Sequence, residues 1–319
     1  MSSKPKKRIK EKKENIDEES DSRFNRVSKK ANIGISILFF LLAASCVIPF
    51  ILVVIISFTS EQSLQMNGYS FWPEEWSIES YKYILSSGTE ILRAYGVTIL
   101  VTVLGTLLGL FIMATYGYAL SRKTFAYRGF FTKLIFIPML FSGGMVASYL
   151  VMVNFLHLKD SILALILPLS VSSFNIIILR TFFRTSVPDA VIESARIDGA
   201  SEMKLFIRIV LPIAIPGIAT IGLFLTLAYW NDWFNAMLYI ENPKLVPVQY
   251  MLIKMEKSME FLISNATLMG TNAIEAASKM PKETVKMAIV VITTLPIMFA
   301  YPFFQKYFVN GLTIGAVKE

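Results

Sequence analysis

The chain has 319 residues, of which 54% are hydrophobic and 17% charged, with a formal net charge of +8. Its mean hydropathy of +0.56 exceeds what a water-soluble domain of this length carries on its surface, so a soluble globular enzyme is not expected. The single cysteine, Cys46, cannot form an intramolecular disulfide, and the single histidine, His157, cannot build a histidine-rich metal site.

Residues 1–32 form a polar tail with eleven Lys or Arg and six acidic residues. The tail has no apolar periodicity, so we expect it to be disordered. A basic tail can bind nucleic acid, but this one continues directly into an apolar segment. We therefore expect it to lie in the cytoplasm against anionic membrane lipid, with no nucleic-acid partner.

Six apolar stretches follow the tail, each about as long as the 20 residues that a helix needs to cross a bilayer. They predict an all-α integral membrane protein with one six-helix domain over residues 33–319. The predicted transmembrane segments are residues 33–58, 94–120, 131–156, 161–183, 213–240 and 285–308.

The basic residues of the connecting regions predict the orientation. If the N-terminal tail is cytoplasmic, the inner regions hold 21 Lys or Arg, counting Arg180 and Lys306 at the inner ends of their segments, and the outer regions hold 8. Basic residues favour the cytoplasmic side, so both termini are predicted to be cytoplasmic. Five lysines in the last outer loop, between Lys244 and Lys282, run against this rule.

The first apolar segment contains a stretch, Leu42–Cys46, that resembles a lipoprotein cleavage site. The apolar run continues from Val47 to Phe58, beyond the length of a signal-peptide core. We therefore expect an uncleaved membrane helix. In the second segment, Gly105 and Gly109 are four residues apart, a spacing that allows close helix packing and indicates no chemistry.

The chain has no motif typical of an enzyme. It contains no Gly-x-x-x-x-Gly-Lys-Ser/Thr phosphate loop, no Gly-x-Ser-x-Gly elbow and no His-Glu-x-x-His sequence. We therefore expect no catalytic residues, no metal site and no ATPase activity in this chain.

The inner loop at residues 184–212 is long and contains several helix-capping and turn residues, so we do not expect it to be a simple connection. Ser186, followed by proline and aspartate, predicts a capped helix over residues 188–198. Gly199 can then adopt the left-handed conformation that ends a helix, and Ser201 can cap a second helix that runs to Arg208. The loop is thus predicted to be a helix, a glycine turn and a helix on the cytoplasmic face.

This loop carries a resemblance to a known family. Glu193-Ser194-Ala195, three residues, Gly199, nine residues and Ile209-Val210-Leu211-Pro212 follow the signature loop of ABC-importer permease subunits, with Ser194 in place of alanine as the one departure. A literal Glu-Ala-Ala at residues 275–277 lies in a predicted outer loop and lacks the glycine.

Further stretches are similar to the maltose-type, carbohydrate-uptake branch of this family. They are Arg180–Phe183, Tyr229–Trp233, and residues 301–308 and 311–318, so that the resemblance extends from about residue 33 to the C-terminus. It implies the permease subunit of an ATP-driven sugar or oligosaccharide importer in a bacterial or archaeal cell (inner) membrane.

The resemblance also implies partners and a coupling site. The partners are a second homologous permease, two ATPase subunits that bind ATP and Mg²⁺, and an extracytoplasmic solute-binding protein. No cofactor is expected in this chain itself. The ATPase contact implied by the family falls on one short stretch, Glu193, Ser194, Ala195, Asp198 and Gly199.

The fifth segment contains a cluster of polar and aromatic residues. Asp232 is the one carboxylate within the six segments, and Trp230, Asn231 and Trp233 adjoin it. Ionisable residues at membrane depth usually face an aqueous path, and sugars bind hydrogen-bonding groups and aromatic faces, so the cluster is a candidate substrate path. The alternative is that it forms headgroup-level and helix contacts.

Two other classes of protein compete with this interpretation. A secondary, ion-coupled transporter would need internal repeats and ionisable residues at the bilayer midplane, but only Asp232 is available and no repeat is visible. An integral membrane enzyme would need nucleophiles or metal ligands, for which the chain offers no candidates.

Overall fold

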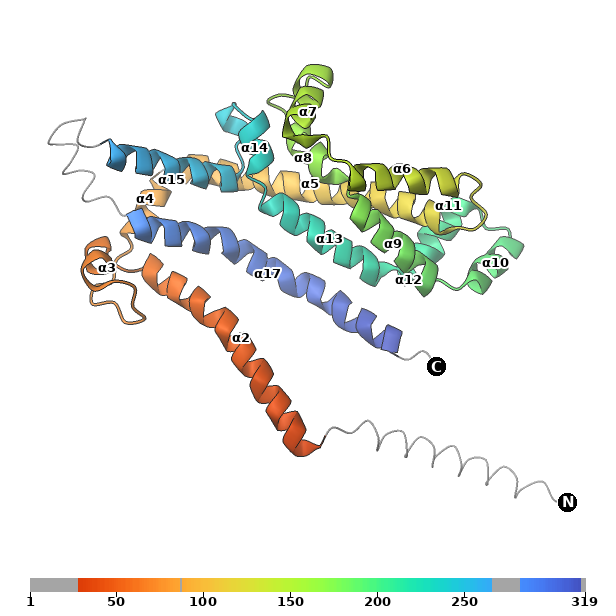
Figure 1. The fold of residues 1–319 in the computed structure, drawn as a ribbon, viewed down its shortest axis with the longest axis horizontal. Coiled ribbons are helices and arrows are strands. Elements are labelled where there is room, and N and C mark those ends of the chain that lie inside the picture. The colour runs from red at the N-terminus through yellow and green to blue at the C-terminus, as the bar shows by residue number, and fades with distance from the viewer. Residues whose placement is uncertain (1–27, 87, 266–281, 317–319) are drawn as a thin grey trace. The chain divides into compact units, whose positions relative to one another are not determined.

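The computed structural model describes residues 28–86, 88–265 and 282–316 (Figure 1). In these ranges every regular element is a helix, apart from an isolated bridge between Thr59 and Trp76. The predicted all-α class is therefore confirmed for the described part of the chain. Residues 1–27 of the predicted tail and the Glu275–Ala277 sequence lie outside it, as do most side chains of the C-terminal stretches at residues 301–318.

The chain divides into two units, residues 1–55 and residues 56–319. Helix α2 (Lys29–Ser57) makes up the described part of the first unit and begins four residues before the predicted segment. The helix runs without a break through Cys46 and Pro49. Its side chains are mostly exposed and apolar, as expected of a helix that meets lipid.

The second unit contains all the remaining elements. In chain order they are α3 (Glu61–Asn67), α4 (Glu79–Leu85), α5 (Gly88–Ser121), α6 (Arg128–Leu140), α7 (Gly144–Leu150), the π-helix η1 (Val151–Phe155), α8 (Ile162–Ser170), α9 (Ser173–Ser186), α10 (Asp189–Ile197), α11 (Glu202–Leu205), the π-helix η2 (Phe206–Val210), α12 (Leu211–Ile213), α13 (Ile215–Trp230), α14 (Phe234–Tyr239), the 3₁₀ turn η3 (Pro243–Leu245), α15 (Val248–Ser264) and α17 (Lys282–Ala316).

Among the described residues, two helices are long and apolar enough to cross a membrane as single spans. These are residues 30–57 of α2 and the whole of α5. Three bent helix pairs also qualify if each pair is one span, which gives up to five spans. The sixth predicted segment falls on α17, which contains Pro296 and Pro302.

The middle segments are each divided into shorter helices, a division that was not predicted from the sequence. Helices α6 and α7 meet at 116°, because the chain is extended at Phe141 and Gly144 has a φ of +78°. Helices α8 and α9 meet at 53°, where the Ser172 side chain caps α9. The predicted segment 213–240 is interrupted after Trp230, and α14 begins separately at Phe234.

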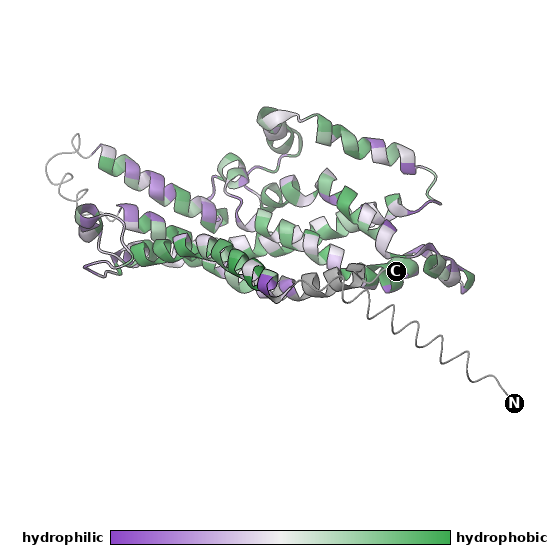
Figure 2. Cartoon of the chain, turned by 60° about the horizontal axis from the view of Figure 1, so that its bottom comes forward, coloured by the Kyte–Doolittle hydropathy of each residue, from purple (hydrophilic) through white to green (hydrophobic). Residues whose placement is uncertain are grey.

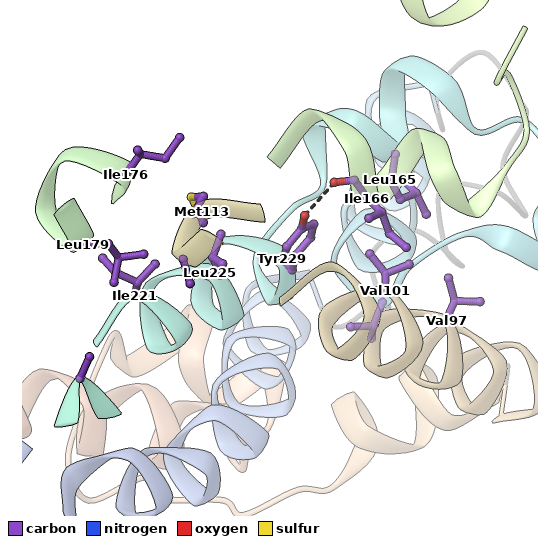
Figure 3. Packing of buried hydrophobic residues seen from close by; sticks show 14 of the residues in the cluster. Val97, Val101, Met113, Leu165, Ile166, Ile176, Leu179, Ile221, Leu225 and Tyr229 are labelled. Atoms are coloured by element: carbon purple, nitrogen blue, oxygen red, sulfur yellow. Dashed lines mark hydrogen bonds between the residues drawn. The ribbon is translucent and has the colours of Figure 1, made fainter. Parts of the chain in front are cut away.

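The core of the second unit is centred on α5, which packs against α8, α9 and α13 (Figure 1). Figure 3 shows apolar side chains from these helices, with Tyr229 directed at α8. The Tyr229 hydroxyl donates a 2.7 Å hydrogen bond to the carbonyl oxygen of Ile166. A β-carbon at Gly109 would lie 2.8 Å from the carbonyl oxygen of Ser170, so the predicted close packing at the two glycines is confirmed.

The long helices are mostly hydrophobic along their lengths, whereas α15 carries many hydrophilic residues (Figure 2). Many large apolar side chains on α5, α6 and α13 are exposed, among them Leu107, Phe111 and Phe224. An exposed apolar surface of this extent fits a helix bundle that meets lipid or other membrane subunits.

Candidate coupling and substrate sites

The predicted helix–turn–helix is present in α10 and α11. Helix α10 starts after Pro188, whose extended backbone makes it the N-cap, and Asp189 occupies the first turn. The prediction that Ser186 caps this helix was wrong, because Ser186 is the last residue of α9. Ser201 does cap the second helix, its Oγ accepting a 3.4 Å hydrogen bond from the Lys204 N–H.

Gly199 ends α10 in the predicted left-handed conformation, with a φ of +76°. The Gly199 N–H donates to the Arg196 carbonyl at 3.0 Å, and the Ala200 N–H donates to the Ala195 carbonyl at 2.9 Å. These two bonds form a Schellman turn, which needs a residue with positive φ at position 199. No atom lies within 4 Å of a β-carbon placed there, so backbone conformation alone favours glycine.

The five predicted coupling residues have different environments. Glu193, Ser194, Asp198 and Gly199 are exposed, but Ala195 is buried with 8% of its surface accessible. The Ser194 hydroxyl donates to the Ala190 carbonyl at 2.9 Å, a bond within its own helix. The four exposed residues are therefore available to a partner, whereas Ala195 packs α10 against the hydrophobic core.

Sequence reasoning missed two apolar residues at this surface. Ile197 on α10 is 86% exposed and Met203 on α11 is 65% exposed. The buried face of α10 carries Ile192 and Ala195, and Ile197 lies about 140° around the helix from Ile192 at about 100° per residue. Helical periodicity could have shown that Ile197 points away from the core.

A polar network joins α10 and α11 to the end of α5. The guanidinium of Arg196 lies 2.6 Å from Glu202 Oε1 and donates to Thr124 Oγ1 at 3.3 Å. The hydroxyl of Tyr118 on α5 donates to Glu202 Oε2 at 3.2 Å. The short helices are therefore tied to each other and to a long helix of the bundle.

A second link connects the start of α10 to the segment after α5. Lys123 Nζ lies 2.9 Å from Asp189 Oδ2, and this hydrogen bond holds the pKa of the Asp189 carboxyl below its usual range. Nearby, the Arg122 guanidinium donates to the Phe183 carbonyl at 3.3 Å. A displacement of α10 would therefore act on the C-terminal ends of α5 and α9 together.

The four predicted substrate-path residues do not converge on one point. Trp230 is 7% exposed, and its Nε1 donates to the Thr293 carbonyl on α17 at 3.0 Å, so it packs two helices together. Asp232 accepts hydrogen bonds from the N–H and the side-chain amide of Asn235, at 3.1 and 2.8 Å, and so stabilises the start of α14. The Asn231 amide donates to the Leu227 carbonyl at 2.9 Å.

Trp233 differs from these three because it is 40% exposed and lines a cavity. This cavity, of about 510 Å³, lies between α14 and α15, and we call it the α15 groove. An adjoining cavity of about 370 Å³ reaches Arg93 on α5 and shares Lys254 and Ser258 with the groove. The residues that line the α15 groove are Trp233, Met237, Tyr250, Ile253, Lys254, Lys257, Ser258, Phe261 and Leu262.

Comparison with known proteins gives consistent matches over most of the chain. Residues 102–314 match the family model of the binding-protein-dependent transport system inner membrane component. The chain is 40% identical over 275 residues to the protein LplC of Bacillus subtilis, covering 86% of this chain and 90% of that protein.

A second relative and a solved structure carry more specific names. The polygalacturonan/rhamnogalacturonan transport system permease protein YtcP of Bacillus subtilis is 36% identical over 294 residues, covering 92% of this chain and 99% of that protein. A crystal structure of a bacterial ABC transporter involved in the import of the acidic polysaccharide alginate aligns with a TM-score of 0.71 at 28% identity, covering 89% of this chain and 99% of that one.

Proposed function

The chain belongs to the family of binding-protein-dependent transport system inner membrane components, and from this premise we propose that it is the permease subunit of an ATP-driven importer of acidic oligosaccharides. The observation that carries the proposal is the α10–α11 pair, with exposed coupling residues at its surface and polar links to α5. A helix pair that transmits movement, in a chain without a phosphate loop, needs an ATPase in another subunit.

The proposed cargo follows from two relatives. One is named as a polygalacturonan/rhamnogalacturonan permease, and the solved importer takes up alginate, an acidic polysaccharide. Polygalacturonan and alginate are both chains of uronic acids, in which each sugar unit carries a carboxylate. The cargo that we propose is therefore an oligosaccharide with uronate carboxylates.

The proposed assembly contains this chain, a second homologous permease, two ATPase subunits and an extracytoplasmic solute-binding protein. ATP and Mg²⁺ bind to the ATPase subunits and not to this chain. The assembly lies in the inner or cell membrane of a bacterium or archaeon. In it this chain spans the bilayer six times with both termini in the cytoplasm.

In the proposed mechanism the ATPase contacts α10 and α11. Glu193, Asp198 and Gly199 lie at the contact, and the exposed apolar side chains of Ile197 and Met203 enter a groove of the ATPase. When two ATPases close around ATP, the helix pair moves as a rigid body. The polar links to α5 then transmit this movement to the membrane helices, which alternate between inward-facing and outward-facing states.

Reconstitution tests this function. The complete importer in proteoliposomes, with binding protein and trigalacturonate outside, is expected to accumulate the sugar only when ATP is present on the ATPase side. The purified permease without ATPase subunits is expected to hydrolyse no ATP. Uptake driven by an ion gradient without ATP would instead identify a secondary transporter, and ATP hydrolysis by the isolated chain would refute the assignment.

A further inference from the structure

The charged residues of α15 are sorted onto different faces of the helix. Lys286 on α17 lies 3.5 Å from Glu256 and 3.4 Å from Glu260, so the two glutamates of α15 face α17 and share a cation. Lys254 and Lys257 instead line the α15 groove. The negative charges of this helix are thus paired with a lysine of α17, while its own lysines line an open cavity.

Neither groove lysine forms an ion pair with another described residue. Among the described residues, no carboxylate oxygen lies within 4.0 Å of Lys254 or Lys257, and both residues are exposed. Lys254 Nζ lies 4.4 Å from the centre of the Tyr250 ring. This cation–π contact stabilises the ammonium group without neutralising its charge. Two adjacent cations in a partly apolar cavity attract an anion more strongly than isolated surface lysines would.

Aromatic side chains form walls of the same groove. Trp233 is 40% exposed and Phe261 is 61% exposed, and Tyr250 also lines the groove. The volume of about 510 Å³ falls in the range of small-molecule sites. A flat apolar ring beside a cation suits a sugar that has one apolar face and a carboxylate.

We propose that the α15 groove is a binding site for uronate units of the oligosaccharide, in which Lys254 and Lys257 bind a carboxylate and Trp233 contacts a sugar face. This inference rests on the proposed function, since it concerns the same cargo. Lys254 also borders the adjoining cavity, where Arg93 is accompanied by the carboxylate of Glu90, so the carboxylate site is confined to the α15 groove. The groove therefore selects acidic over neutral oligosaccharides.

Binding without the solute-binding protein tests the groove directly. Fluorescent trigalacturonate is titrated against the complete importer in nanodiscs, with the solute-binding protein omitted. The double variant Lys254→Met/Lys257→Met is expected to raise the dissociation constant about tenfold or more, because each lysine provides a charge-assisted hydrogen bond. The variant Lys254→Arg/Lys257→Arg is expected to retain binding, and Lys244→Met, which removes an exposed outer lysine that does not line the groove, is the matched control.

Uptake by the same variants reconstituted in proteoliposomes separates the two proposals. If wild-type importer transports trigalacturonate and the double methionine variant binds and transports it equally well, the groove is rejected and the function stands. If wild-type importer transports no uronate oligosaccharide, the proposed cargo fails and the groove inference fails with it. If Trp233→Ala releases the partner permease while the lysine variants bind normally, the groove is a subunit interface and the inference is also overturned.

Discussion

The ring of Tyr229 on α13 lies in the space that a β-carbon on residue 105 of α5 would occupy. Gly105 therefore allows the two helices to approach, and the Tyr229 hydroxyl continues across the interface to the Ile166 carbonyl on α8 at 2.7 Å (Figure 3). Three membrane helices thus meet at one tyrosine. Their contact depends on the absence of a side chain at position 105.

We expect Gly105→Ala to destabilise the bundle by about 1–3 kcal/mol, because the new methyl group must displace a ring that is buried and hydrogen-bonded. The measurement is the thermal unfolding midpoint of the purified importer. Gly96→Ala on the same helix is the control, since no atom lies within 4 Å of a β-carbon there. Equal losses of stability for both variants would contradict this account of the interface.

Local patterns in the sequence were sufficient to predict several features of the structure. The spacing of Gly105 and Gly109 predicted close helix packing, and Gly199 followed by Ser201 predicted the turn between two short helices. These features depend on residues close together in the chain, where backbone conformation and spacing determine the outcome.

Features set by distant residues could not be predicted in this way. The burial of Trp230 depends on Thr293, and the α15 groove depends on how α14 and α15 pack. The bend at Gly144 needs a positive φ that the surrounding apolar run concealed. The network that holds α10 also joins residues far apart, since Tyr118 and Glu202 are separated by 84 positions.

Gly199→Val is expected to uncouple ATP hydrolysis from transport. A β-branched residue with a φ of +76° is strained by about 1–2 kcal/mol, and the turn that orients α10 and α11 would change. The variant should insert in the membrane but lose the ATPase on co-purification, or hydrolyse ATP without sugar uptake. Gly129→Val, at an open position of α6 without positive φ, is the control. Wild-type uptake and ATPase retention in Gly199→Val would show that this turn is not the coupling element.

Disrupting the Arg196–Glu202 ion pair is expected to affect coupling more than stability. Both side chains are partly exposed, so Arg196→Met should change the free energy of unfolding by less than about 1 kcal/mol. Uptake per ATP hydrolysed should nevertheless fall several-fold, because α10 loses its link to α11 and Thr124. Glu202→Gln added to Arg196→Met should cause little further loss, since the ion pair is already broken and the glutamine oxygen can still accept the hydrogen bond from Tyr118. Arg208→Met, an exposed arginine of the same region, should behave as wild type, and a comparable loss there would point to net charge instead.

Glu61 is expected to stabilise the start of α17. Its buried carboxylate accepts hydrogen bonds from the N–H of Glu283 at 3.2 Å and from the N–H and hydroxyl of Thr284 at 3.0 and 2.9 Å. Glu61→Ala removes this cap and should cost about 1–2 kcal/mol, with Glu61→Gln intermediate. Differential scanning fluorimetry of the purified importer measures the effect. Glu79→Ala, at an exposed glutamate in the first turn of α4, should leave the midpoint nearly unchanged.

Asp160 is expected to give the loop between η1 and α8 a stability that depends on pH. Its Oδ1 accepts hydrogen bonds from the backbone N–H groups of Asn242 and Glu241, at 2.7 and 2.6 Å, and these hold the pKa of the carboxyl below its usual range. The unfolded chain therefore binds a proton more readily than the folded chain does. The stabilisation is complete above the ordinary aspartate pKa of about 3.9 and is lost as the pH falls through the lower folded value.

The difference in thermal midpoint between wild type and Asp160→Asn tests this pH dependence. Asparagine tolerates the φ of +56° at this position and keeps an acceptor oxygen, so the variant removes the charge with little change in backbone conformation. Wild type should be the more stable protein at pH 7, and the difference should shrink as the pH is lowered below about 4. A difference that stays constant down to acid pH would mean that the charge of the carboxylate does not contribute to the stability of this loop. The difference between the two proteins would then come from the shape of the side chain alone.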